Sequence, residues 1–467
     1  MKWRKSVFYL FFKSRIMRPL WVIICLLPFM GFLLPHMIQG ARAQSFNEAL
    51  ALALANNPTL AAADSQYQAV RQRQITAFSA SLPQVTGYVR STTMESETRC
   101  EALSTSDTGL CQSLDRVEID PRNRAEGWGV NATLDLFTSG KNFNDFRKAR
   151  SDIRAQELSL RATEQMILLN AATVYLNVLR DEAVLGLRQK NIDVLQRRYE
   201  AVRDQFDVGI VTRTDMAQSE SRLKLAESNF IRQQATLEAA RANYKEVIGQ
   251  LPNQLETPKT LPSLPTRIDD ALQLARQQSP TLLSVQENAR GTEYTTYSVI
   301  GSALPKISLF GNYSVTDDPT FRQRGEEEEV TRYGIEMTMP LFTGGRSLAA
   351  INASRHVANQ TTMQVHAASN QVEREVKVTW HDFHAAGGQI ESSRKQITAA
   401  EIALNGVIQE RELGIRSILD VLDAEEELLD ARVALIQAEH ARIVAAYRLL
   451  SVIGGLTRNQ LELPATP

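Results

Sequence analysis

The sequence predicts a mainly α-helical chain that carries four β-strands and consists of two tandem structural repeats, residues 44–265 and 266–467. Three observations predict this fold class. Short motifs occur twice in the same order, two long spans contain no proline, and four segments alternate apolar and polar residues. Because the repeat is about half the chain, we expect each half to build the same set of elements.

The repeat is visible in pairs of matching motifs. An offset of 222 positions relates the first pair, and an offset of 205 positions relates the others. The offset changes between Pro83 and Trp128, where the first half holds 17 extra residues. The matching pairs are Leu82-Pro83 with Leu304-Pro305, Leu136-Phe137-Thr138 with Leu341-Phe342-Thr343, Val208-Gly209 with Leu413-Gly414, and Asp215 with Asp420.

Residues 1–43 have the pattern of a secretory signal peptide. They contain seven basic and no acidic residues, an apolar run from Leu20 to Leu34, and the small-residue motif Ala41-Arg42-Ala43. We expect cleavage before Gln44, with a permanent membrane anchor as the alternative. The remaining chain has 45 basic side chains (52 less the seven in the signal) against 53 acidic ones. This negative charge argues against nucleic acid as a partner.

Two cysteines remain after removal of the signal. Cys100 and Cys111 both lie in a polar segment of the first repeat, between Pro83 and Trp128, where the offset changes. Because export places them in an oxidising compartment, we interpret them as a disulfide. A metal-binding pair is the alternative, and it lacks a nearby histidine or third cysteine.

Four segments have the alternation of β-strands. In one of them Trp128, Val130 and Leu134 alternate with polar residues or glycine. Strands of about ten residues with a period of two suit the wall of an outer-membrane barrel, and an exposed soluble hairpin is the alternative. The expected strands are residues 84–94, 126–137, 306–316 and 331–342. Aromatic residues in positions suited to a membrane-interface girdle are Tyr88, Trp128, Phe137, Tyr313 and Phe342.

Four strands are too few to close a barrel. An unpaired sheet edge in hydrocarbon costs several kcal/mol for each polar backbone group, so such edges do not persist in a membrane. The barrel must therefore be shared among subunits, and we expect an obligate oligomer.

The proline-free spans predict very long helices. No proline occurs between Pro121 and Pro252 or between Pro340 and Pro464, and both spans are rich in Ala, Leu, Gln, Glu and Arg. A helix of 66 residues, such as 141–206, is roughly 100 Å long. The expected long helices are residues 141–206, 214–248, 346–412 and 417–453, with shorter helices at about 46–80 and 268–302.

The last helix carries two apolar stripes. Leucine or isoleucine recurs every seven residues from Leu422, and a second register holds alanines from Ala424. Glu425, Arg432 and Glu439 fall between the stripes, and we expect them to face water. A helix with one neighbour on each side belongs in a hollow wall, whereas an ordinary coiled coil or bundle is the alternative.

These residues resemble the TolC-type outer-membrane efflux channel family over essentially all of residues 44–463. The resemblance implies a homotrimer in which a twelve-stranded β-barrel in the outer membrane continues into a twelve-helix α-barrel in the periplasm. It also implies a passive exit duct of a tripartite efflux pump or type I secretion system, without a cofactor. The implied partners are a periplasmic adaptor protein, an inner-membrane pump or ABC transporter, and outer-membrane lipid. The motifs that carry the resemblance are the duplicated Leu-Pro and Leu-Phe-Thr motifs, Phe206-Asp207-Val208-Gly209, and the segment from Leu413 to Asp423.

The same resemblance assigns the turns between the long helices to the periplasmic tip. Asp420 and Asp423 are three residues apart, so both carboxylates share one helical face. Three chains would place six carboxylates around one axis, a ring that favours cations and titrates as a coupled set. The alternative is that these acids only cap or solvate the helix starts. The residues expected to contact the adaptor at the turns are Val208, Gly209, Leu413 and Gly414.

Other residues are expected to complete a gate at this tip. Arg416 is expected to pair with Asp215 or a neighbouring acid and hold the tip shut. Thr214 and Asp215 form the matching tip segment of the first repeat. Arg411 stands where some family members have a gating tyrosine, so the closing contacts are expected to differ in detail.

The sequence indicates no enzyme. It lacks a nucleophile elbow, a phosphate-binding loop and a zinc signature, and the pair His381 and His384 has no third ligand nearby. The rival function is a periplasmic coiled-coil structural or adaptor protein, which would share the export signal and the heptads. Such a protein would not need four alternating strands in two matched pairs.

Overall fold

The computed structural model describes residues 45–93, 124–258, 261–317, 327–461 and 463. The chain separates into the units Met1–Arg42 and Ala43–Pro467, and every described residue belongs to the second. The expected signal peptide, 1–43, and the expected disulfide between Cys100 and Cys111 therefore lie outside the described residues.

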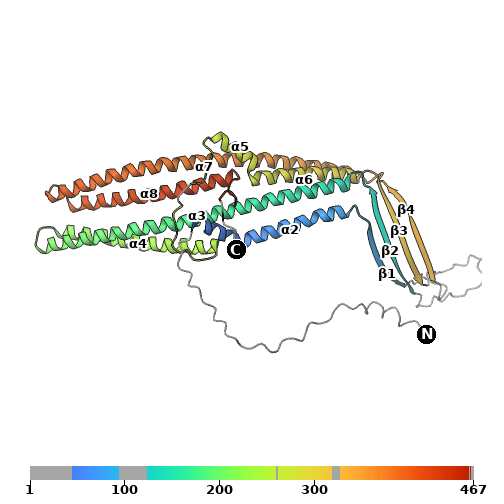
Figure 1. Ribbon diagram of the computed structural model, residues 1–467, viewed down its shortest axis with the longest axis horizontal. Coiled ribbons are helices and arrows are strands. Elements are labelled where there is room, and N and C mark those ends of the chain that lie inside the picture. The colour runs from blue at the N-terminus through green and yellow to red at the C-terminus, as the bar shows by residue number, and fades with distance from the viewer. Residues whose placement is uncertain (1–44, 94–123, 259–260, 318–326, 462, 464–467) are drawn as a thin grey trace, which may run out of the picture. The chain divides into compact units, whose positions relative to one another are not determined.

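Eight helices and four strands make up the described part of the chain (Figure 1). Two helices, two strands and two further helices follow one another, and this order then occurs a second time. The elements are α1 (Phe46–Asn56), α2 (Pro58–Ser79), β1 (Gln84–Thr93), β2 (Arg124–Phe137), α3 (Lys141–Asp207), α4 (Arg213–Ile248), α5 (Ile268–Gln278), α6 (Pro280–Ser302), β3 (Lys306–Asp317), β4 (Glu327–Thr338), α7 (Arg346–Glu412) and α8 (Ile418–Val452).

The long helices pair as hairpins. α3 packs against α4 and α7 packs against α8, while α3 also contacts α8, α6 and α2. α3 and α7 each have 67 residues, or roughly 100 Å at the helical rise. Among the described residues, none of the helices combines the length and apolar character needed to cross a membrane.

The two shorter helices expected from the sequence are each divided in two. Pro58 and Pro280 occupy the first position of α2 and α6, and the residues before them, Asn57 and Ser279, have extended backbones. Proline disfavours the helical conformation of the preceding residue but is well tolerated at a helix start. The expectations of single helices over 46–80 and 268–302 were therefore wrong at the same place in both halves.

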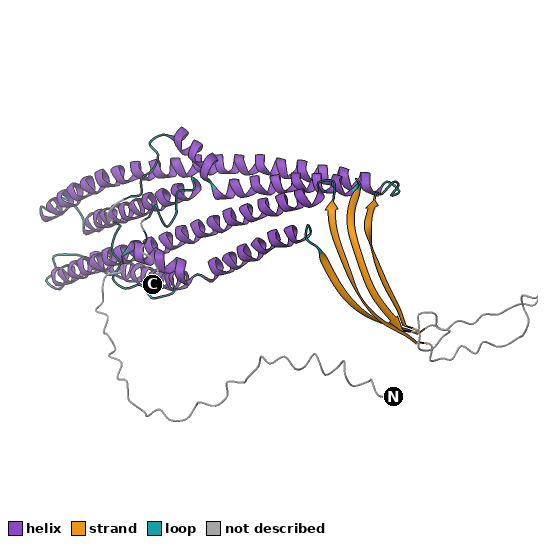
Figure 2. Ribbon diagram, turned by 45° about the vertical axis from the view of Figure 1, so that its right-hand side comes forward, coloured by secondary structure: helices purple, strands orange, loops and turns teal. Residues whose placement is uncertain are grey.

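The strands form one antiparallel sheet in the order β1-β2-β3-β4 (Figure 2). The register pairs Val89 with Trp128, and Trp128 with Val315, so the alternating apolar residues of neighbouring strands fall on one face. Asn131 and Asn312 pair on the opposite face, where their side chains share a hydrogen bond. One face of the sheet is thus largely apolar, and the other is largely polar.

The fourth strand ends earlier than expected. It covers Glu327–Thr338, whereas the sequence predicted residues 331–342. Lys306, the first residue of β3, pairs with Thr338, so residues beyond this point have no partner in β3. Pro340 also lacks the backbone N–H that a strand would use. The apolar side chains of Leu341 and Phe342 therefore lie beyond the strand, where both are exposed.

Two aromatic side chains occupy the polar face of the sheet. The Tyr88 ring lies so close to Gly129 that an added Cβ there would be 2.6 Å from its hydroxyl oxygen. A Cβ at Gly334 would likewise be 3.1 Å from the Phe310 ring. Glycine thus makes room for an aromatic ring on the adjacent strand. Tyr88 pairs with Gly129 and lies on the polar face of the sheet. Its assignment to an outward aromatic girdle was therefore wrong.

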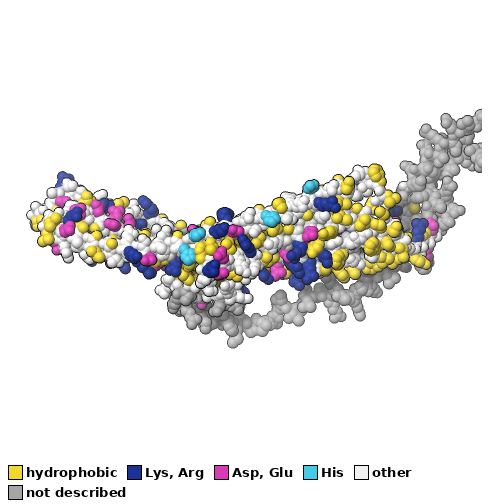
Figure 3. Space-filling model, turned by 90° about the horizontal axis from the view of Figure 1, so that it is seen from above, with side chains coloured by type: hydrophobic (Ala, Val, Ile, Leu, Met, Phe, Trp, Pro, Cys, Tyr) yellow, Lys and Arg dark blue, Asp and Glu magenta, His cyan; other side chains and the backbone are white. Residues whose placement is uncertain are grey.

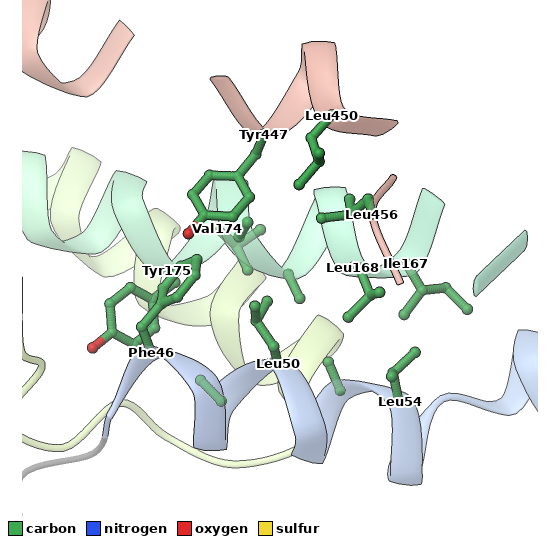
Figure 4. Close-up of a cluster of buried hydrophobic side chains, with 14 of the residues drawn as sticks. Phe46, Leu50, Leu54, Ile167, Leu168, Val174, Tyr175, Tyr447, Leu450 and Leu456 are labelled. Atoms are coloured by element: carbon green, nitrogen blue, oxygen red, sulfur yellow. The ribbon is translucent and has the colours of Figure 1, made fainter. Parts of the chain in front are cut away.

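The largest hydrophobic core lies where α1 meets the middle of α3 and the end of α8 (Figure 4). The Phe46 ring packs edge-on against Tyr175, with ring centroids 5.2 Å apart, and also contacts Tyr447. The Tyr175 hydroxyl donates to the Glu256 carbonyl at 2.8 Å. Burial raises the pKa of Tyr175 to about 12. This core ties the segment after α4 to both hairpins.

Candidate functional site at the two hairpin turns

The turns that end α3 and α7 have the same backbone conformation. Gly209 and Gly414 have φ of 79° and 77°, a left-handed conformation that glycine adopts without strain. The amide of Ile210 donates to the Gln205 carbonyl, and that of Ile415 donates to the Glu410 carbonyl. Such bonds satisfy carbonyls that the helix end leaves without partners. The turns therefore stop both helices in the same way and reverse the chain within a few residues.

Apolar side chains project from both turns into solvent. Val208 and Leu413 directly follow α3 and α7, and their exposed fractions are 71% and 77%. Ile210 and Ile415, which follow the glycines, are similarly exposed. Exposed apolar groups gathered on a short turn are typical of a contact surface for another protein. The residues expected to meet an adaptor thus lie together in two matching exposed turns.

Two of the predicted gate acids form capping boxes. Asp215 accepts from the backbone amide of Thr212 at 2.9 Å, and the Thr212 hydroxyl caps α4 in return. Asp420 and Ser417 repeat this arrangement at the start of α8. The hydrogen bonds from Ser417 lower the pKa of Asp420. Both acids therefore have the capping role that the sequence left open as an alternative.

Arg416 pairs within its own hairpin. Its Nε lies 2.8 Å from Glu410 Oε2, and its Nη1 lies 3.8 Å from Asp420 Oδ1. The expected pairing with a neighbouring acid is therefore present, whereas the structure gives no contact between Arg416 and Asp215. Thr214 lies exposed in the first turn of α4.

Arg411 reaches from α7 toward the other hairpin. Its Nη2 donates to Gln205 Oε1 on α3 at 3.3 Å. Burial lowers the pKa of Arg411, as does the nearby positive charge of Arg198, and Asp215 opposes the change. Arg411 thus links α7 to the first hairpin, which Arg416 does not.

The third predicted gate acid, Asp423, forms an ion pair between the hairpins. The guanidinium of Arg222 on α4 contacts Asp423 through Nη2 and Glu426 through Nη1. One turn of α8 therefore places two carboxylates around one cation of α4. Sequence reasoning identified Asp423 but missed Arg222 and Glu426.

Glu425 is buried beside the same cluster. Its Oε1 lies 2.5 Å from Arg198 Nη2 of α3, and only 7% of its side chain is exposed. The expectation that Glu425 faces water was therefore wrong, whereas Arg432 and Glu439 keep 45% and 46% of their side chains exposed. α8 packs against α3 as well as α7, and Arg432 and Glu439 pair with Glu401 and Arg394 of α7.

A small apolar cluster holds the hairpins together next to these charges. Leu195 and Val202 of α3 meet Leu223 of α4, and Ile418 and Leu422 of α8 join them. Beside it lies a cavity of about 50 Å³ lined by Arg222, Glu425 and Glu426 among others. In the described part of the chain, no three His, Cys, Asp or Glu side chains gather in a way that suits a metal ion.

Comparison with known proteins identifies the family. The family model for outer membrane efflux proteins matches residues 49–250 and 271–455. The chain belongs to this family. The two matched segments fall in the first and second halves of the chain, so the recognised region includes both hairpins and all four strands.

Three relatives illustrate the similarity. The outer membrane efflux protein BepC of Brucella suis is 32% identical over 335 residues, which cover 72% of this chain and 73% of BepC. The outer membrane protein TolC of Vibrio cholerae is 23% identical, covering 77% and 86% of the two chains. The alkaline protease secretion protein AprF of Pseudomonas aeruginosa is 24% identical, covering 89% and 85%.

Solved structures have the same fold. The CusC structure superposes with a TM-score of 0.75 at 20% identity, covering 88% of this chain and 92% of CusC. The structure of the outer membrane protein VceC of Vibrio cholerae superposes with a TM-score of 0.74 at 19% identity, covering 88% of this chain and 96% of VceC. The mostly helical fold with four antiparallel strands, the family and the outer-membrane location expected from the sequence are confirmed. This outer-membrane efflux protein acts in transport across that membrane.

Proposed function

We propose that this outer-membrane efflux protein works as a homotrimer, with a twelve-stranded barrel in the membrane and a twelve-helix tunnel in the periplasm. The observation that carries the proposal is the sheet of the described residues, in which β1 and β4 are edge strands. Because each unpaired backbone group in hydrocarbon costs several kcal/mol, β4 of one copy has to pair with β1 of the next.

The helices support the same assembly. α7 exposes Leu348, Val357 and Met363, which are 65%, 47% and 61% exposed in the single chain. Apolar side chains also cover much of the face seen in Figure 3, particularly near the strands. An exposed apolar surface of this extent is typical of a protein interface. Neighbouring copies in a trimer would cover it.

The duct requires partners to supply its cargo. We infer that it serves a tripartite efflux pump or a type I secretion system, through a periplasmic adaptor and an inner-membrane pump or ABC transporter. The names of the relatives include both protease secretion and cation efflux. The exposed turns at Val208–Ile210 and Leu413–Ile415 are the proposed contacts for the adaptor, because they present apolar side chains at one end of both hairpins.

The assembly is tested with detergent-extracted full-length protein. We expect a mass of three chains by light scattering and discrete conductance steps in planar lipid bilayers. A stably folded single subunit without conductance would contradict the proposal. A soluble, monomeric rod in the periplasmic fraction would instead support the rival adaptor function.

The gate is tested at the carboxylates. We propose that Asp420 and Asp423 from three chains form a cation-favouring constriction at the tip, with Thr214, Asp215 and Arg416 beside it. Replacing both aspartates by alanine is expected to lower the cation preference and weaken block by multivalent cations. Glu246→Ala, an exposed acid at the far end of α4, is the control. Unchanged selectivity in the double variant would show that this ring is not the constriction.

A further inference from the structure

Asp423 does not stand alone in the structure. The guanidinium of Arg222 lies between the carboxylates of Asp423 and Glu426, with one Nη directed to each. Arg222 comes from α4 and both acids come from α8, so this contact joins the two halves of one chain. The side chain of Arg222 is 29% exposed, while those of Asp423 and Glu426 are 55% and 46% exposed.

This arrangement changes the charge that the acids contribute. Asp423 and Glu426 together carry two negative charges, and Arg222 reduces their net charge from −2 to −1 in each chain. Salt-bridged carboxylates attract a passing cation less than free ones, because the field of the pair falls off as that of a dipole. The neighbouring Asp420 is engaged separately, with Ser417 and Arg416.

Arg198, another nearby cation, pairs with a different acid of α8. Arg198 pairs with the buried Glu425, and only 22% of its side chain is exposed. Among the described residues, Arg222 is the cation that the structure places in contact with Asp423, and its own side chain is partly exposed. Its charge lies where it influences ions that approach Asp423.

We propose that Arg222 is a selectivity-determining residue, which neutralises Asp423 and Glu426 of its own chain and thereby limits the cation preference of the channel. The proposal rests on the proposed trimeric duct with Asp423 at its constriction. It assigns to α4 a residue that tunes the field of acids on α8. The effect should depend on salt, since charges more than about 8–10 Å apart are largely screened at physiological ionic strength.

The test compares the cation-to-anion permeability ratio of reconstituted full-length channels in planar bilayers. We expect Arg222→Gln to raise this ratio about threefold at low salt, with a smaller change near 1 M salt. The concentration of hexamminecobalt that blocks half the current should fall several-fold. Arg222→Lys, which keeps the charge, should restore most of the wild-type ratio.

Arg232→Gln is the matched control. Arg232 lies on the same helix and is exposed, and the structure gives no ion pair between its guanidinium and another described residue. This variant should keep the wild-type ratio. Adding Asp423→Asn and Glu426→Gln to Arg222→Gln should abolish the gain, because the acids that Arg222 neutralises are then gone.

A second variant tests the same contact in case Arg222→Gln does not fold. Glu426→Gln keeps Arg222 and removes one of its two partners, so it should lower the cation preference. Equal ratios for Arg222→Gln, Arg232→Gln and wild type would overturn the proposal, and so would an unchanged ratio in Glu426→Gln. If the wild type conducts and the variant lacking Asp420 and Asp423 loses selectivity, an unchanged ratio in the Arg222 variant contradicts the role of Arg222 and leaves the proposed duct intact. Absence of any wild-type conductance would overturn the duct itself.

Discussion

The buried ion pair between Arg198 and Glu425 gives a prediction whose magnitude follows from the structure. Arg198 Nε donates to Glu425 Oε1 at 2.6 Å, and the Glu425 side chain is 7% exposed. Arg198→Met would leave this carboxylate buried without its cation. Removing one partner of a buried pair costs about 3–5 kcal/mol. Because Arg198 remains 22% exposed and water can partly replace it, we expect the lower end, about 3 kcal/mol.

The double variant distinguishes the pair from general packing. Arg198→Met combined with Glu425→Leu replaces both charges by apolar groups of similar size, a change that is often neutral or stabilising. We therefore expect the double variant to be within about 1 kcal/mol of wild type, although the single variant is not. Lys395→Gln removes an exposed pair with Glu391 on α7 and should leave stability unchanged.

Hydrogen exchange measures the effect where it occurs. The amides of α8 near Glu425 should exchange about a hundredfold faster in Arg198→Met, which corresponds to about 3 kcal/mol of local opening free energy. The double variant should recover most of the protection. An exchange rate in Arg198→Met equal to wild type would refute the reasoning, as would a double variant as unprotected as the single one.

Three further predictions concern other parts of the chain. Burial and the positive charge of Arg180 lower the pKa of His440 to about 4. Between about pH 6.5 and 4 the unfolded state therefore binds a proton that the folded state does not, so the free energy of unfolding should fall by at most ~3 kcal/mol as the pH drops through this range. His440→Gln should remove this part of the pH dependence of the melting temperature. Gly414→Ala should destabilise the protein by about 1–2 kcal/mol, because the second turn needs a positive φ at this position. Gly406 lies inside α7 with open space around it, so thermal unfolding should show Gly406→Ala to be neutral or stabilising. Tyr175→Phe should cost about 1–2 kcal/mol, because the hydroxyl donates to the Glu256 carbonyl and accepts from the Glu256 amide. Denaturant unfolding measures this cost, and no change in the midpoint would contradict the prediction.

The sequence predicted the main elements because their signals are local. Alternation with a period of two and long proline-free spans depend only on near neighbours along the chain. The breaks before Pro58 and Pro280 were also readable, since the preceding residue avoids the helical conformation. The end of β4 could not be predicted in this way, because it depends on where the partner strand β3 begins, at Lys306.

In the candidate site, too, the local features could be predicted from the sequence and the long-range contacts could not. The capping boxes of Thr212 with Asp215 and of Ser417 with Asp420 are visible as a hydroxyl residue followed three positions later by an acid. The pairing of Arg198 with Glu425 joins residues 227 positions apart. No local pattern indicates such a contact, because it depends on which face of α8 meets α3.

The long-range ion pairs occur where the two halves of the duplication differ. The turn glycines and capping boxes keep the offset of 205 positions, so both hairpins end in the same backbone. The charges between the hairpins do not obey this symmetry. Positions equivalent to Arg198 and Arg222 hold Ala403 and Glu427, and the position equivalent to Asp423 holds Gln218. Divergence at these few positions places arginines of the first hairpin opposite carboxylates of the second, in ion pairs that stabilise the contact of α8 with α3 and α4.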